Sequence, residues 1–144
     1  ALFRSGFAGK PESVAPGDGL VLRDCLITAA VRCAPPGNKP LPEEMDNCRE
    51  YLRGELQLDG RKRVVIALGR IAFDTLFKIS RQEGMPAASP KPEFRHGGEY
   101  ASPGGVMLIA SYHPSQQNTQ TGRLTRPMFH RTFRRARALV DRDS

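Results

Sequence analysis

Three short apolar runs, each ended by turn-forming residues, constrain the fold of this chain most strongly. They are CLITAAVR at residues 25–32, VVIAL at residues 64–68 and VMLIASY at residues 106–112. Runs of this length that are apolar at almost every position are typical of parallel strands buried on both faces. Because helical patterns alternate with them, the sequence predicts an α/β fold, a three-layer α/β/α domain around a central parallel sheet.

Helical patterns fill much of the chain between and after the runs. A helix can begin at Pro42, and Gly69 permits a tight turn from the second run into a helix over residues 70–79. A last helix is predicted from about Pro127, and residues 81–105, rich in Pro, Gly and Ser, are predicted to form a loop. The helix from Pro42 is predicted to bury Met45, Cys48, Leu52 and Leu56 on its inner face. The last helix is predicted to bury Phe129, Phe133, Ala136 and Val140.

The chain opens with ALFRSGFAG, in which Leu2, Phe3 and Phe7 share one helical stripe that Gly6 and Gly9 would end. No capping residue precedes this predicted helix, so we expect the natural chain to begin earlier. At 144 residues, the length predicts a single domain with one core, here a truncated domain over residues 1–144.

Positive charge is concentrated toward the end of the chain. The net charge is +7, and residues 113–144 hold seven Arg against two Asp, so this part supplies +5 of it. Such a surface attracts polyanions, most often nucleic acid, although a solvated helix face would carry the same charge. No apolar run approaches the roughly 20 residues that span a bilayer, so we expect a cytoplasmic protein that does not bind membranes.

His113 directly follows the third run. Ligands of parallel α/β sheets bind outside the carboxyl ends of the strands, and Pro114 restricts the backbone next to this imidazole. A histidine placed there could donate a hydrogen bond to a developing anion. We expect the other two histidines, His96 and His130, to be structural.

The segment QQNTQTGR at residues 116–123 is rich in neutral amides and hydroxyls. These groups suit contacts with phosphate, sugar or base edges, and Gly122 lets a ligand approach the backbone closely. A solvated loop is the alternative interpretation, but the neighbouring Arg123 and Arg126 favour nucleic acid.

The three cysteines are Cys25, Cys33 and Cys48. Their spacing does not match the short pairs of zinc knuckles, so by itself it is weak evidence for a metal. Burial as small apolar residues is the other interpretation, because free cysteines are commonly buried.

Three longer segments form a recognisable pattern: ITAAVRCAPPGNKPLPEE, followed later by Cys48, then VVIALGRIAF, and YHPSQQNTQTGRLT. Together they resemble the uracil-DNA glycosylase superfamily, specifically the iron-sulfur family 5 (type b) enzymes, over nearly the whole chain. The resemblance implies base excision repair, in which uracil and other deaminated bases are flipped out of double-stranded DNA and the N-glycosidic bond is hydrolysed. It also implies an enzyme that acts as a monomer.

The resemblance assigns roles to particular residues. His113 is expected to be catalytic and to face the uracil O2 edge, while Ala29 and Asn38 are expected to line the base pocket. Gln120 stands where the family pattern has an aromatic residue, which leaves Leu124 as the apolar candidate for insertion into the duplex. The expected DNA-binding residues are Ser115, Gln116, Gln117, Asn118, Thr119, Gly122 and Arg123.

Cys33 and Cys48 match the last two of the four cysteines that hold a 4Fe-4S cluster in these enzymes. The resemblance places the first two cysteines, the first strand of the sheet and an acidic catalytic residue upstream, so we expect this chain alone to be inactive. Two other functions stay open. One is a catalytically inert nucleic-acid-binding module of the same fold. The other is a small-molecule α/β enzyme, for which LGRIAF without a G-x-G-x-x-G or Walker pattern is weak support.

Overall fold

The structure is a computed structural model of the chain. It describes residues 1, 3–11, 17, 19–25, 27, 43, 63–82, 92–101 and 106–142. Nearly all of the predicted strand at residues 25–32 lies outside this part, as does the helix predicted from Pro42, apart from Glu43, which is helical. In the part described, no helix combines the length and the apolar character that crossing a membrane requires.

Two of the predicted strands form the centre of a small sheet. β1 (Val64–Leu68) and β3 (Met107–Ser111) pair in parallel, with Val64 opposite Met107 and Leu68 opposite Ser111. A further strand, β2 (Glu99–Ala101), pairs with β3 in the antiparallel direction, so the order is β1-β3-β2. The prediction of a loop over residues 81–105 was therefore wrong at residues 99–101. The predicted α/β class with a parallel pair at its centre is confirmed, and the antiparallel β2 makes the described sheet mixed.

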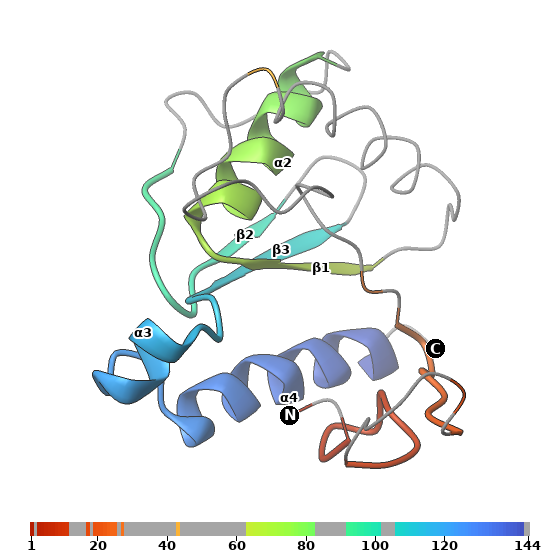
Figure 1. Cartoon of the computed structure of the whole chain (residues 1–144). Coiled ribbons are helices and arrows are strands. Elements are labelled where there is room, and N and C mark those ends of the chain that lie inside the picture. Colours follow the sequence, from red (N-terminus) through yellow and green to blue (C-terminus); the bar gives the residue numbers. More distant parts are fainter. Residues whose placement is uncertain are drawn as a thin grey trace.

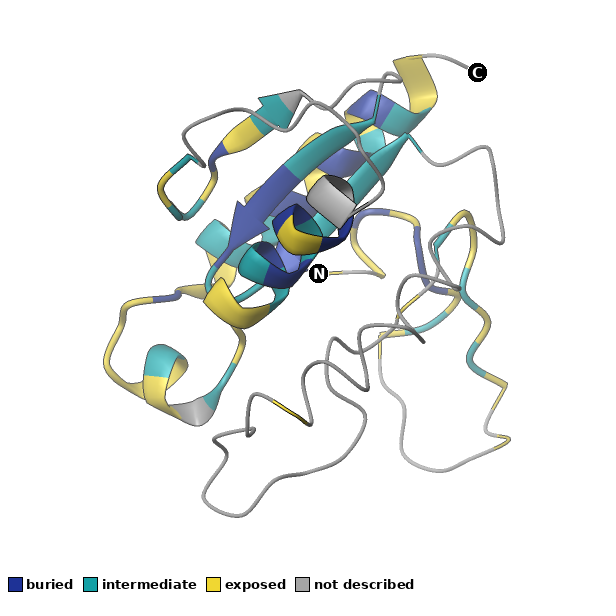
Figure 2. Cartoon of the chain, turned by 90° about the horizontal axis from the view of Figure 1, so that it is seen from above, coloured by how far each residue is buried: buried dark blue, intermediate teal, exposed yellow. Residues whose placement is uncertain are grey.

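Helices cover both faces of this sheet. α2 (Arg70–Gln82) lies on one side and α4 (Arg126–Arg142) on the other (Figure 1). Alternate residues of the strands serve the two sides: Ala67 and Ala110 pack with the α2 side, and Ile109 packs with α4. This period of two is what a strand buried on both faces requires, and the buried residues concentrate in and against the sheet (Figure 2).

The two apolar clusters differ in composition. Next to α2, Phe73 lies 4.9 Å from Phe77 and 5.4 Å from Tyr100 of β2, measured between ring centroids. Aromatic pairs at this separation contribute about 0.5–1.5 kcal/mol each beyond the area that they bury. The Tyr100 ring thus adds to the antiparallel pairing that holds β2 at the edge of the sheet, a contribution that a three-residue strand does not reveal in its sequence pattern.

α4 begins one residue before the predicted start. The Thr125 side chain caps it, because Thr125 Oγ1 accepts a hydrogen bond from the Met128 N–H at 3.3 Å. Phe133 and Ala136 are buried as predicted, but Leu139 replaces Val140 as the buried residue of the last turns. A short helix, α3 (Gln116–Gln120), precedes α4 and was not predicted.

The helix predicted at residues 1–9 is absent from the residues that the structure describes there. Residues 3–6 form a turn, and Ala8 makes an isolated antiparallel bridge with Leu22. Phe3 is 46% exposed whereas Phe7 is 4% exposed, so the two rings do not share a buried stripe. Gly6 has a φ of +79°, a left-handed value that ends helical hydrogen bonding.

Arg137 of α4 holds this N-terminal segment. Its guanidinium donates hydrogen bonds to the carbonyl oxygens of Ser5 and Gly6, both at 2.9 Å, and lies 4.0 Å from the centroid of the Phe7 ring. It also pairs with Asp24 at 3.2 Å. Contacts with α4, rather than a helix of its own, therefore determine the path of the first residues.

Candidate active site

β1 and β3 end level with one another, and this places the candidate site. The Gly69 N–H donates to the Ser111 carbonyl at 2.8 Å, so the chain leaves both strands at the same edge of the sheet. Gly69 has a φ of +94°, and a Cβ atom at this position would lie 3.3 Å from the Cβ of His113. His113 is therefore packed directly beside the turn from β1 into α2, at the carboxyl end of β3 as predicted.

The backbone of His113 is fixed while its imidazole is exposed. The His113 carbonyl accepts two hydrogen bonds, one from the Ser115 N–H at 2.8 Å and one from Asn118 Nδ2 at 2.9 Å. Pro114 lies between His113 and Ser115, and its ring restricts the backbone there. The exposed ring can thus meet a ligand without the loop that carries it having to become ordered first.

The residues after Pro114 fold into α3 because their side chains complete its hydrogen bonds. Ser115 Oγ caps the helix by accepting from the Asn118 N–H at 3.3 Å. The Thr119 hydroxyl donates to the Ser115 carbonyl at 2.9 Å, and the Thr121 hydroxyl donates to the Gln117 carbonyl at 2.7 Å. Much of the polarity that the sequence shows here therefore stabilises the loop itself.

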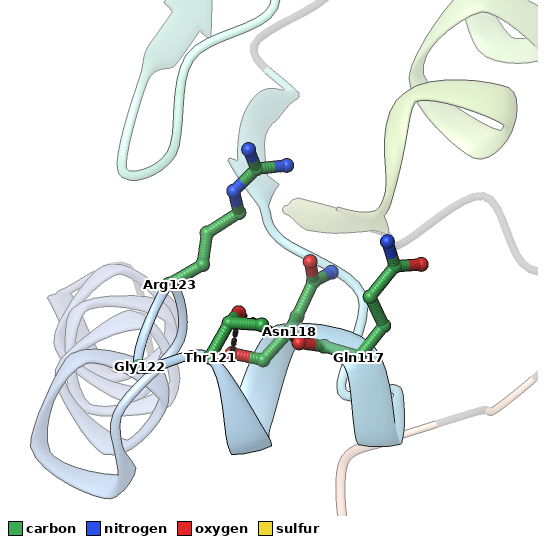
Figure 3. A pocket seen from close by; sticks show the side chains of 5 residues that line it. All are labelled: Gln117, Asn118, Thr121, Gly122 and Arg123. Carbon is green, nitrogen blue, oxygen red and sulfur yellow. Dashed lines mark hydrogen bonds between the residues drawn. The ribbon is translucent and has the colours of Figure 1, made fainter.

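A hollow of about 420 Å³ lies over this helix. Figure 3 shows the ends of the Gln117, Asn118 and Arg123 side chains extending toward the same side of α3. The lining brings together amides, a hydroxyl, a cation and an open backbone position, all of which suit polar contacts with a nucleotide. The residues that line it are Gln117, Asn118, Thr121, Gly122 and Arg123.

Tyr112 connects this loop to the rest of the sheet edge. The Arg123 guanidinium lies 5.8 Å from the centroid of its ring, and the His96 ring stacks on it at 5.0 Å. His96 Nδ1 accepts the Tyr112 N–H at 3.0 Å, which requires a neutral imidazole. Burial lowers the pKa of His96, the nearby Arg131 lowers it further, and a backbone hydrogen bond with Met128 opposes them. These contacts support the prediction that His96 is structural.

The structure brings together only some of the predicted site residues. Of the predicted DNA-binding set, Gln117, Asn118, Gly122 and Arg123 line the hollow, and Thr121 joins them. Gln116 is the first residue of α3, and the hydroxyls of Ser115 and Thr119 bond within the loop. Ala29, Asn38, Cys33 and Cys48 lie outside the described residues.

Leu124, next to the site, and Cys25, on the α4 side of the sheet, both pack toward the core. Leu124 is 3% exposed and part of the core, so the prediction that it is available to enter a duplex was wrong. Its N–H donates to the Asn118 carbonyl at 2.9 Å, which turns the side chain inward at the end of the loop. Cys25 packs partly buried against the cluster of Ile109 and Phe133, and burial raises the pKa of its thiol, with Arg137 acting in the opposite direction.

The sequence holds ambiguous signals for two features that were not predicted, the helix α3 and the contact of Gly69 with His113. Ser115 followed by three polar residues fits a capped helix as well as a loop. A single Gly after a strand is ordinary, so nothing in the sequence pairs Gly69 with His113. Among the residues described, no group of three or more His, Cys, Asp or Glu side chains is arranged to hold a metal ion.

Comparison with known proteins identifies the family. Type-5 uracil-DNA glycosylases are similar to this chain: that of Thermus thermophilus is 50% identical over 139 residues, 96% of this chain and 61% of the relative. That of Pyrobaculum aerophilum is 45% identical over 96% of this chain and 57% of the relative, and that of Mycobacterium tuberculosis 43% over 97% and 51%. The chain thus spans about half to three fifths of the length of these relatives. Because the family model for the uracil DNA glycosylase superfamily matches residues 2–137 in addition, this chain belongs to that superfamily.

Proposed function

We propose that this protein is a DNA glycosylase that removes uracil, and other deaminated bases, from double-stranded DNA during base excision repair. Membership of the superfamily and the names of the relatives support the class of reaction. The single structural observation that supports it most is the exposed imidazole of His113, presented beside Gly69 on a fixed backbone. The proposed unit of action is the monomer.

The proposed reaction is hydrolysis of the bond between the base and the sugar. A base inside a duplex is inaccessible, so the nucleotide is turned out of the stack before the bond breaks. The base leaves with the electron pair of the C1′–N bond, and the oxygen of a water molecule bonds to C1′. The proton that this water gives up ends on the departing base.

His113 stabilises the charge that develops on the departing base. As the bond stretches, the uracil O2 becomes more negative, and the His113 N–H donates a hydrogen bond to it. A donor of this kind is effective when it is positioned before the reaction, because no reorganisation is needed in the transition state. The two hydrogen bonds on the His113 carbonyl provide that positioning.

The hollow over α3 is the proposed contact with the distorted duplex. Gln117 and Asn118 offer amides, and Arg123 adds a positive charge that the phosphate backbone attracts. A Cβ atom at Gly122 would have nothing within 4 Å, so this position leaves room for the backbone of a strand to approach. Contacts with phosphate and sugar hold the lesion in register without reading its sequence.

The test is single-turnover excision from a uracil-containing duplex by the full-length protein. We expect His113→Ala to slow excision by about 10²- to 10³-fold, the usual cost of one such donor. Binding to a duplex with an abasic-site analogue should be nearly unchanged. His113→Gln, which retains an N–H donor, should recover part of the rate.

Unchanged excision by His113→Ala would contradict the role of His113. A wild-type protein that binds the duplex but never excises uracil would contradict the proposed function, and would fit the inert nucleic-acid-binding module instead. The basic charge of α4 alone does not separate these two outcomes, whereas the excision measurement does.

We further propose that Cys33 and Cys48 are two of the ligands of a 4Fe-4S cluster. Thiolates are the ligands that such clusters need, which supports the two cysteines. Cys25 does not fit that role, because its thiol packs against the core and burial raises its pKa. When bound, the cluster would supply a covalent link between the segments that carry its cysteines.

The iron content of cysteine variants tests which cysteines bind the cluster. We expect the purified full-length protein to be brown, with absorbance at ~400 nm as for a thiolate-held cluster, and to lose iron in Cys33→Ser and Cys48→Ser. Cys25→Ser is the matched control and should retain iron. A colourless, iron-free preparation with full excision activity would contradict the proposal.

A further inference from the structure

A second hollow lies along the first turns of α4, apart from the hollow over α3. Its volume is about 240 Å³. Four of its six lining residues are arginines, and none is a carboxylate. We call it the arginine cradle, and its residues are Arg4, Arg126, Pro127, His130, Arg131 and Arg134.

The geometry of α4 brings these cations together. Residues 126, 130 and 134 follow one another at intervals of four, which places them along one face of a helix. Phe133 and Ala136 face the sheet instead. Arg4 reaches the cradle from the N-terminal segment, which Arg137 holds against α4. The cradle therefore exists only in the folded chain.

The charge of the cradle is not neutralised within the part of the chain that the structure describes. The ion pairs of α4 there involve Arg135, which pairs with Glu99 at 2.8 Å, and Arg137, which pairs with Asp24 and Asp141. Neither arginine lines the cradle. The positive end of the helix dipole, at the first turn of α4, adds to the potential of Arg126.

The protonation of His130 is affected by this positive potential. Arg134 Nε donates to His130 Nε2 at 3.1 Å, an arrangement that only a neutral imidazole accepts. Among the described residues, His130 Nδ1 is buried and has no hydrogen-bond partner. Burial lowers the pKa of His130, and the cations of Arg134 and Arg4 lower it further. A bound anion would relieve the repulsion among these groups.

We propose that the arginine cradle binds a backbone phosphate of the DNA strand, flanking the nucleotide that the loop after His113 contacts. Arg126 follows Arg123 of the first hollow by three residues, so the two hollows adjoin along the chain at the start of α4. Arginine suits this role because its planar fork donates two parallel hydrogen bonds to phosphate. The inference rests on the proposed function, and it extends the DNA contact beyond the predicted residues 115–123.

The salt dependence of binding tests the cradle. Each phosphate that a protein neutralises steepens the plot of log affinity against log salt concentration by about 0.9. We expect Arg126→Gln and Arg131→Gln each to weaken binding to an abasic-analogue duplex, and the double variant to reduce the slope by about 1 for each phosphate that is no longer neutralised. Fluorescence anisotropy over a sodium chloride series measures both quantities.

The control removes the same charge elsewhere. Arg23→Gln with Arg142→Gln lowers the net charge equally, at exposed positions that do not line the cradle. Its slope should stay at the wild-type value. If the cradle variant and this control have equal slopes while both remain folded by circular dichroism, the proposal is overturned.

Excision separates failure of the cradle from failure of the proposed function. At limiting protein concentration the cradle variant should excise uracil more slowly than the wild-type protein, because it binds the duplex less tightly, whereas the Arg23→Gln and Arg142→Gln control should not. Wild-type excision together with an unchanged slope in the cradle variant would overturn the cradle alone. A reduced slope without any excision by the wild-type protein would support the cradle and overturn the glycosylase function.

Discussion

Gly69→Ala should damage both the stability of the fold and the position of His113. At φ +94°, Gly69 has a left-handed backbone conformation that L residues adopt only at a cost. Left-handed and related strained conformations cost about 1–3 kcal/mol per residue. For a domain of this size, about 1 kcal/mol corresponds to a melting temperature lower by roughly 4 °C.

The new methyl group adds an effect on activity. It would lie 3.3 Å from the His113 Cβ, so that side chain has to shift by a few tenths of an ångström. A misplacement of 1 Å at a reacting group costs on the order of 10²-fold in rate, so a shift of about 0.3 Å predicts excision slower by roughly 4-fold. Binding of an abasic-analogue duplex should change little.

Gly97→Ala is the matched control. Gly97 also has a positive φ, +77°, but a Cβ there would have nothing within 4 Å. We expect it to lower the melting temperature without slowing single-turnover excision by the folded protein. Equal excision rates for the two variants would refute the inferred contact between Gly69 and His113, and an unchanged melting temperature in Gly69→Ala would refute the strain.

Three further contacts of the described residues are tested by substitution. Arg137→Met removes two charge-assisted hydrogen bonds to carbonyls and a cation–π contact, and should lower the free energy of unfolding in urea by about 3 kcal/mol; a loss below about 1 kcal/mol would argue against it. Asn118→Leu removes one hydrogen bond of about 1 kcal/mol from the His113 carbonyl and should slow excision by roughly 5-fold, while Thr119→Val, in the same helix, should not. Burial lowers the pKa of His96 below the ordinary 6.5, so the folded state resists its protonation and stability should fall as pH drops below about 6.5. His96→Gln should make the melting temperature depend less on pH between about pH 8 and pH 5. If the variant and the wild-type protein show the same pH dependence, His96 is excluded as its cause.

The central elements could be predicted because their residues are consistent at the local level. β1 and β3 are apolar on both faces, and α2 repeats its aromatic residues at helical spacing. β2 could not be predicted from three residues, since its pairing with β3 and the contacts of Tyr100 with the rings of α2 are tertiary contacts that a short local pattern does not show. The N-terminal turn was predicted as a helix because local pattern alone cannot include the hydrogen bonds that Arg137 makes.

The candidate site, too, was predicted only in part. The place of His113 at the carboxyl end of a strand followed from the order of the elements, and the structure confirms it. The polarity of residues 116–123 predicted a contact surface, but not that Ser115 and Thr119 use their hydroxyls inside α3. The roles of Ala29, Asn38, Cys33 and Cys48 stay predictions.

The arginine cradle was not predicted as a unit. The arginines of α4 were visible as a charged tail, yet Arg4 joins them only through tertiary contacts between the two ends of the chain. Sequence spacing relates residues on one helix, and it says nothing of which distant segment lies against that helix.

The parallel pairing of β1 with β3 has a consequence for how this protein folds. A helix and an edge strand separate the two strands along the chain, so the pair forms only after a long segment has closed, and such closure must precede the contacts that stabilise it. Gly69 meets His113 only once that pairing is complete. Refolding from denaturant should therefore be slower than for an all-helical domain of this length, because the site forms only after a non-local pairing.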